Sequence, residues 1–123
     1  MVLVVLKDVG NYFQNISKIE KKSSKIIFEP GRFIVANTAI LITKIIYIKK
    51  SNKINFIILD AGMNNLMRPA LYNAHHNIVP LKKKGKFAAG NLKFVGPICE
   101  STDKFSYQKS FSQIREGDYV SLT

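Results

Sequence analysis

The 123-residue sequence is poor in cysteine, tryptophan and arginine. It contains one cysteine, no tryptophan and only three arginines, although its formal net charge is +11. A single cysteine, Cys99, excludes a disulfide within the chain and is typical of a protein kept in a reducing cytoplasm. We therefore expect a cytoplasmic protein of one domain or part of one.

The sequence also lacks an apolar run long enough to cross a membrane. Its longest apolar tract, residues 33–48, is interrupted by Asn37, Thr38, Thr43 and Lys44, whereas a transmembrane helix needs about 20 consecutive apolar residues. The apolar residues 1–6 are too few for the core of a signal peptide. We expect no contact with a membrane.

The positive charge is mostly lysine. Lysine supplies 16 of the 19 basic residues, and the chain also has 16 isoleucines and 10 asparagines, a combination typical of AT-rich coding sequence. Codon bias therefore accounts for much of the charge, and arginine is the residue favoured for gripping phosphate. A basic nucleic-acid-binding module is the alternative, with lysines at 21–22, 49–50, 82–84 and 86 near phosphates and Tyr47, Phe87 and Phe94 stacking on bases.

Short β-branched segments separated by Gly, Pro and Asn predict a mostly β fold, either a barrel or a sandwich. Residues 39–48 and 54–59 predict a β-hairpin around a basic loop. Other strands are expected at 1–6, 26–28, 78–81, 92–95 and 119–122. The proline and glycine at 30–31 predict a turn that follows the second of these strands.

Residues 60–72 place an acid, an arginine and a tyrosine directly after an apolar run. Arg68 and Tyr72 are four residues apart, so one helical turn would place them on the same side. An arginine can hold a carboxylate with two parallel hydrogen bonds, and a tyrosine hydroxyl can add a third. The spacing predicts a carboxylate-binding pair in a loop or helical turn that Pro69 ends or kinks. Asp60 is expected to be a structural turn residue.

Four segments, in order, resemble the carboxyl-terminal part of the diaminopimelate decarboxylase family. They are FEPGRFIVAN at 28–37, DAGMN at 60–64, MRPALY at 67–72 and VGPICES at 95–101. The segment EGDYV at 116–120 fits as well, and the resemblance covers about residues 26–122. These enzymes join an alanine-racemase-like (β/α)8 barrel to a β-barrel domain and use pyridoxal 5'-phosphate. The resemblance implies that 37–123 form that β-barrel domain, truncated at its end, and that 1–36 are a remnant of the cofactor-binding barrel.

The resemblance also implies roles for particular residues. Glu29 matches the acid beside the pyridine nitrogen of the cofactor, where a carboxylate keeps the ring protonated. Cys99 matches the proton donor, and it and Glu100 are similar to residues that reach across a dimer interface. The implied cofactor-binding residues are Glu29, Pro30, Gly31 and Arg32, and the implied substrate-binding residues are Arg32, Arg68, Tyr72 and Glu100. No metal is implied, and His75 and His76 are not expected to bind one.

Measured against such an enzyme, three parts are missing from these residues. The lysine that forms the Schiff base lies early in the family's barrel, and no lysine here has a matching context. Of the glycine-rich phosphate loop only Gly10 remains, and the tyrosine-bearing segment that ends the family's site is absent.

We therefore expect the chain alone not to convert meso-diaminopimelate into L-lysine and CO2. It would be a relic or half of a split enzyme, working as a homodimer or with a separately encoded barrel. A non-catalytic partner of a full-length decarboxylase is a further alternative.

Overall fold

The computed structural model describes residues 31–82, 85 and 90–123, and of residues 32 and 33 only the backbone. The chain divides into two compact units, Met1–Ala39 and Ile40–Thr123. The expected strands at 1–6 and 26–28 lie outside the described residues. That 1–36 derive from a barrel domain stays a prediction.

The described part of the first unit contains a short helix where a turn was expected. Helix α2 (Gly31–Val35) begins directly after Pro30 in the sequence. After the helix, the N–H and the hydroxyl of Thr38 both donate to the carbonyl of Val35, at 3.2 and 2.8 Å. The turn expected from Pro30 and Gly31 is therefore not formed at Gly31, which is the first residue of the helix.

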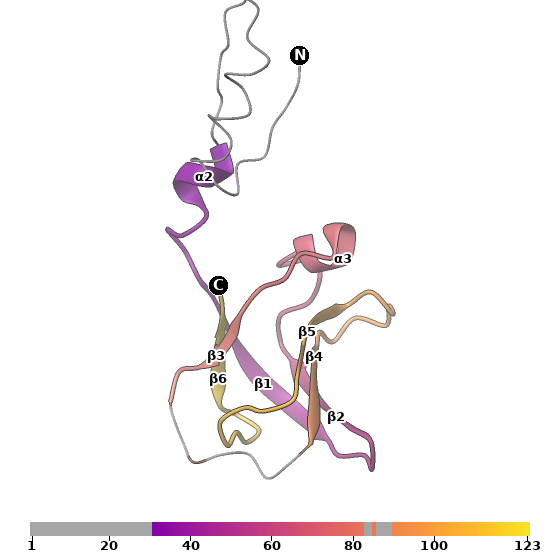
Figure 1. Ribbon diagram of the computed structural model, residues 1–123. Coiled ribbons are helices and arrows are strands. Elements are labelled where there is room, and N and C mark those ends of the chain that lie inside the picture. The colour runs from indigo at the N-terminus through magenta and orange to yellow at the C-terminus, as the bar shows by residue number, and fades with distance from the viewer. Residues whose placement is uncertain (1–30, 83–84, 86–89) are drawn as a thin grey trace, which may run out of the picture. The chain divides into compact units, whose positions relative to one another are not determined.

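The second unit is a six-stranded sheet, which confirms the mostly β prediction (Figure 1). The strand order is β3-β6-β1-β2-β4-β5, and every neighbouring pair is antiparallel except β2 and β4, which are parallel. The expected hairpin is formed by β1 and β2. The strands are β1 (Leu41–Lys49), β2 (Ile54–Leu59), β3 (Ile78–Pro80), β4 (Asn91–Val95), β5 (Lys104–Gln108) and β6 (Tyr119–Leu122).

The sheet curls until its two edge strands approach each other. The side-chain amide of Gln108, at the end of β5, donates to the carbonyl of Ile78 on β3 at 3.4 Å. Two irregularities in register, one in β1 and one between Phe94 and Val95 in β4, accompany this curvature. Bulges increase the local twist of a strand and help a sheet to bend. The result is a partly closed barrel.

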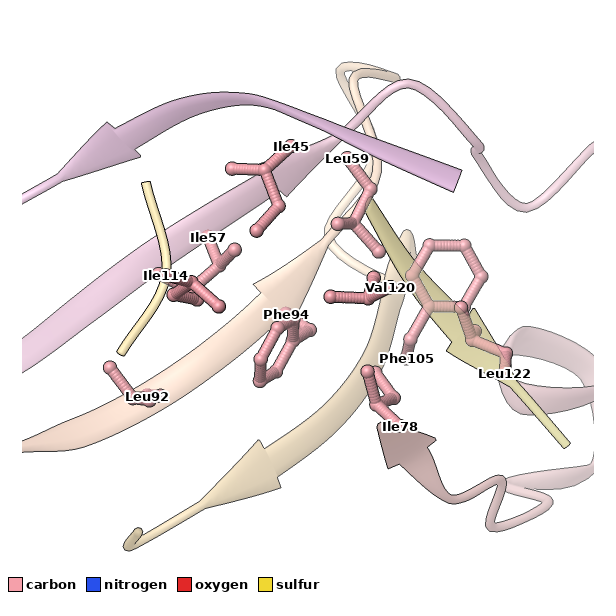
Figure 2. Packing of buried hydrophobic residues seen from close by; sticks show 10 residues of the cluster. All are labelled: Ile45, Ile57, Leu59, Ile78, Leu92, Phe94, Phe105, Ile114, Val120 and Leu122. Carbon is pink, nitrogen blue, oxygen red and sulfur yellow. The ribbon is translucent and has the colours of Figure 1, made fainter. Parts of the chain in front are cut away.

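The core fills the concave side of the sheet. Figure 2 shows ten buried side chains, from all six strands and from the segment before β6, gathered in one cluster. Phe94 is 0% exposed, and its ring lies 5.0 Å from that of Phe111 in a tilted arrangement. The cluster consists of Ile45, Ile57, Leu59, Ile78, Leu92, Phe94, Phe105, Ile114, Val120 and Leu122.

The second described helix, α3 (Arg68–Tyr72), follows β2. Pro69 is buried in its first turn, so it starts the helix and does not end or kink it as expected. The fixed backbone angle of proline suits that position, and its missing N–H is one that would have no partner there. The helix ends at Asn73, which has a left-handed backbone (φ 50°) and donates its N–H to the carbonyl of Arg68. No helix in the described part of the chain is long and apolar enough to span a bilayer.

Candidate functional site

The parallel pairing of β2 with β4 brings two of the sequence motifs together. Ile58 pairs with Val95 near the ends of these strands, so the segments that follow β2 and β4 leave the sheet at the same end. We call residues 60–67 the β2 loop and residues 96–103 the β4 loop. The β2 loop leads into α3, and the β4 loop carries Cys99 and Glu100.

The β2 loop is fixed to β1 at its first residue. The carboxylate of Asp60 accepts the backbone N–H of Lys44 at 2.8 Å and the hydroxyl of Thr43. The same Thr43 oxygen accepts the N–H of Ala61 at 3.1 Å. These contacts, the hydroxyl of Thr43 first, hold the pKa of Asp60 below its ordinary value of 3.8. Asp60 thus anchors the loop.

The two loops touch at a glycine. The N–H of Gly62 donates to the side-chain oxygen of Asn65 at 3.0 Å, and the N–H of Asn65 returns a bond to the carbonyl of Gly62 at 2.9 Å. A Cβ at Gly62 would come within 2.8 Å of the Cδ1 atom of Ile98 in the β4 loop. Glycine is therefore required here for close approach of the two loops.

The β4 loop presents an exposed thiol beside a carboxylate. Both Cys99 and Glu100 are exposed. The Glu100 carboxylate accepts the N–H of Thr102 at 3.2 Å, its hydroxyl at 3.3 Å and the hydroxyl of Ser101 at 3.0 Å. These bonds, led by that from the Thr102 N–H, lower the pKa of Glu100 from its ordinary value of 4.5. The loop therefore favours the charged form of Glu100.

Arg68 and Tyr72 lie on the same side of α3, as their spacing predicts. The Cζ atom of Arg68 is 5.5 Å from the centre of the Tyr72 ring, a cation–π distance. Tyr72 is 69% exposed, whereas Arg68 is half-buried. Arginine both stacks on aromatic rings and binds carboxylates with two hydrogen bonds.

The residues expected to bind the cofactor are described only in part. Gly31 is the exposed first residue of α2, and Arg32 lies within that helix. Glu29 and Pro30 are outside the described residues, as are the lysines at 21–22 that the nucleic-acid alternative used. The structure does contradict one part of that alternative, because Phe94 is 0% exposed and cannot stack on a base.

Sequence reasoning missed two buried polar residues that organise this end of the sheet. Thr43 and Asp103 are 2% and 3% exposed, and each accepts backbone N–H groups from a loop. Nothing in the sequence marks Thr43, which lies in a strand among isoleucines. Asp103 had a signal, because it stands two residues beyond the VGPICES segment.

Two surface hollows lie in the described part of the chain. One surface hollow is lined around Ile48, Arg115 and Glu116, and another between Phe56, Val95 and Pro97. Neither is lined by Cys99 or by the Arg68–Tyr72 pair. Within the described ranges no three His, Cys, Asp or Glu side chains are grouped as metal ligands would be.

Comparisons with known proteins find relatives that belong to one family. Residues 8–123 match the family described as "Pyridoxal-dependent decarboxylase, C-terminal sheet domain". The diaminopimelate decarboxylase of Aquifex aeolicus is 42% identical over 105 residues, which are 85% of this chain and 24% of that protein. The Haemophilus influenzae enzyme is 45% identical over 96 residues, 78% of this chain and 23% of that protein.

Solved structures agree with these relatives. The diaminopimelate decarboxylase of Helicobacter pylori complexed with L-lysine has a TM-score of 0.72 at 38% identity, covering 91% of this chain and 27% of that one. The arginine decarboxylase of Paramecium bursaria Chlorella virus, at 15% identity and a TM-score of 0.70, shares the fold. The chain spans about a quarter of the length of the curated relatives that it matches.

Proposed function

Because the chain belongs to the pyridoxal-dependent decarboxylase family and matches its C-terminal sheet domain, we propose that it forms the substrate-side part of a diaminopimelate decarboxylase site. The reaction would remove CO2 from meso-diaminopimelate and leave L-lysine. Bound pyridoxal phosphate supplies the electron sink for this chemistry. The observation that supports the proposal most is that the parallel β2–β4 pair places the β2 loop, which leads to Arg68, beside the β4 loop, which carries Cys99.

In this proposal Arg68 and Tyr72 hold the carboxylate of the substrate farthest from the reacting carbon. The guanidinium can form two parallel hydrogen bonds to a carboxylate, and the phenol hydroxyl can add one. Because Arg68 already lies over the Tyr72 ring, less side-chain freedom is lost on binding.

Cys99 would return a proton to the carbon that loses CO2, with Glu100 contacting the substrate beside it. Both side chains are exposed on the β4 loop, whereas a proton donor acts best where water is excluded. We therefore propose that a second surface covers them in the working enzyme, either a second copy of the chain or a separately supplied barrel.

The segment from Glu29 to Arg32 would contact the cofactor from the remnant of the barrel domain, residues 1–36. The chain spans about a quarter of the length of its relatives, and we propose that these 123 residues alone do not decarboxylate. The lysine that holds the cofactor and the glycines that cradle its phosphate would come from the barrel.

A chimera tests the proposal. Residues 26–122 of this chain would replace the matching part of the Aquifex aeolicus relative, and lysine formation from meso-diaminopimelate would be measured. We expect an active chimera whose kcat falls roughly 10²- to 10⁴-fold in Cys99→Ala. Arg68→Lys should raise KM because lysine cannot grip a carboxylate bidentately. Arg115→Lys, an equivalent change at an exposed site in another loop, should match the unmodified chimera.

Three results would oppose the proposal. A chimera that folds but forms no lysine, or one that Cys99→Ala leaves fully active, would remove the assigned roles. Lysine formation by the isolated 123-residue chain with added pyridoxal phosphate would show that no separate barrel is needed.

A further inference from the structure

A buried aspartate joins the two loops that carry the proposed site residues. Asp103 is 3% exposed. Its Oδ1 atom accepts the N–H of Met63 at 2.7 Å, and its Oδ2 atom accepts the N–H of Ile98 at 2.8 Å. Met63 belongs to the β2 loop and Ile98 to the β4 loop. One carboxylate therefore links two backbone segments that leave different strands.

The main chain of Asp103 also closes the β4 loop around Cys99. Its carbonyl accepts the N–H of Gly96 at 3.1 Å, and its N–H donates to the carbonyl of Glu100 at 3.0 Å. A Cβ at Gly96 would overlap both carboxylate oxygens of Asp103. Glycine at this position is what leaves room for the carboxylate.

A carboxylate is a costly group to bury, so its presence needs a reason. Here both oxygens accept backbone N–H groups, and hydrogen bonds to a carboxylate are short, strong and directional. The contact of Gly62 with Ile98 also joins the loops, but apolar contact sets no direction. The carboxylate fixes both the spacing and the orientation of the two amides because its oxygens belong to one planar group.

We propose that Asp103 is a positioning residue, which holds the Cys99–Glu100 turn in a fixed relation to the loop that leads to Arg68. It acts through Met63 and Ile98 and does not touch the substrate. The inference rests on the proposed function for its catalytic consequence, but the link between the loops can be measured without any reaction.

The first test uses the thiol, because alkylation of this chain reports on its single cysteine. Asp103→Asn keeps the shape of the side chain but turns an N–H donor toward one of the two amides. Gly96→Ala keeps Asp103 but adds a methyl group that displaces its carboxylate. In both variants Cys99 should be alkylated roughly threefold faster or more, because the turn is released. The NMR signals of the amides of Met63 and Ile98 should shift as well.

Two matched controls separate this effect from a general loss of stability. Asp118→Asn changes an acid whose Oδ2 atom accepts the N–H of Arg115 at 2.9 Å in the turn before β6. Gly85→Ala adds a Cβ whose nearest neighbour, Oε1 of Gln113, is 4.0 Å away. Both should keep the wild-type alkylation rate and the wild-type signals of the two linked amides. Wild-type values in Asp103→Asn and Gly96→Ala would overturn the proposal.

If those two variants fail to fold, hydrogen exchange on the unmodified chain decides. If the two loops open as one linked unit, the amides of Met63 and Ile98 should have the same protection factor, that is, the exchange rate corrected for the intrinsic rate of each amide. Clearly different protection factors for the two amides would overturn the link.

The catalytic consequence is measured in the chimera. Asp103→Asn should lower kcat per folded molecule roughly 10- to 100-fold, because even a small misplacement of a reacting group lowers the rate strongly. KM should change less. An unchanged kcat would reduce Asp103 to a structural residue. An inactive parent chimera would refute the proposed function, and the alkylation and exchange results would still decide whether Asp103 links the loops.

Discussion

The hydroxyl of Thr43 should contribute more to the free energy of unfolding than its small size suggests. Thr43→Val has nearly the same shape but removes two hydrogen bonds at once. The carboxylate of Asp60 loses a donor, and the N–H of Ala61, a residue 6% exposed, loses its acceptor. A buried donor left without a partner costs about 1–3 kcal/mol, and a bond to a charged group is worth about 1.5–3 kcal/mol. Because Asp60 is exposed to water, we take the lower end of the range for the bond to the charged group. The free energy of unfolding should then fall by about 3 kcal/mol in total.

The loss should depend on pH in a defined direction. The hydrogen bond from Thr43 is the largest cause of the lowered pKa of Asp60. Its contribution is therefore fully present above the ordinary value of 3.8 and is lost as pH falls through the lower folded value. The difference between wild type and Thr43→Val should be constant from neutral pH down to mildly acidic pH and then shrink. The part due to Ala61 should remain.

Urea unfolding followed by far-UV circular dichroism measures this, since the chain has no tryptophan. Thr43→Ser is the control: it loses one methyl group, about 1 kcal/mol, but keeps the hydroxyl and so the wild-type pH dependence. A difference between wild type and Thr43→Val below about 1 kcal/mol at neutral pH would refute the reasoning. A difference that stays constant through the titration of Asp60 would refute the assigned cause.

Three further predictions follow from single contacts. Phe94→Ala should lower the free energy of unfolding by about 3–5 kcal/mol in urea titrations, because this fully buried ring leaves a cavity; a loss below about 1 kcal/mol would contradict its central place. Asn73→Gly should be nearly neutral and Asn73→Val should cost about 1–2 kcal/mol, because φ is 50°; equal effects would contradict the left-handed cap. The NMR titration of Glu100 should give a pKa below 4.5 that rises in Ser101→Ala, and an unchanged value would exclude that hydrogen bond.

The sequence was sufficient for most of the strands and for the family. The hairpin of β1 and β2 and the strand β6 were predictable because β-branched residues recur between clear turn residues. Strand β5 was not predicted, although its residues KFSYQ alternate between polar and aromatic side chains as those of a strand do. The irregularity opposite Val95 leaves Phe105 buried and Tyr107 exposed, although they are two residues apart. The sequence alternation therefore does not reveal which of the two aromatic side chains enters the core.

The candidate site was predictable only where it is local. Arg68 and Tyr72 meet because a helical turn brings residues four apart together, and their spacing was visible in the sequence. The meeting of the β2 and β4 loops depends instead on parallel pairing between strands that are far apart in the chain. Periodicity within one segment carries no information about that pairing, so the link made by Asp103 could not be foreseen.

The placement of buried polar groups connects the stability of the fold with its proposed role. Among the described residues the buried polar side chains are Thr43, Asp103 and Ser121. Thr43 accepts an N–H group of the β2 loop, and Asp103 accepts one N–H group from each of the β2 and β4 loops. Cys99 and Glu100, in contrast, are exposed. Burying polar groups is costly unless they are hydrogen-bonded, and those of Thr43 and Asp103 are both bonded to the loops that they hold in place. Rigid loops that present exposed reactive groups are what a site completed by a second surface requires, since positioning must precede docking.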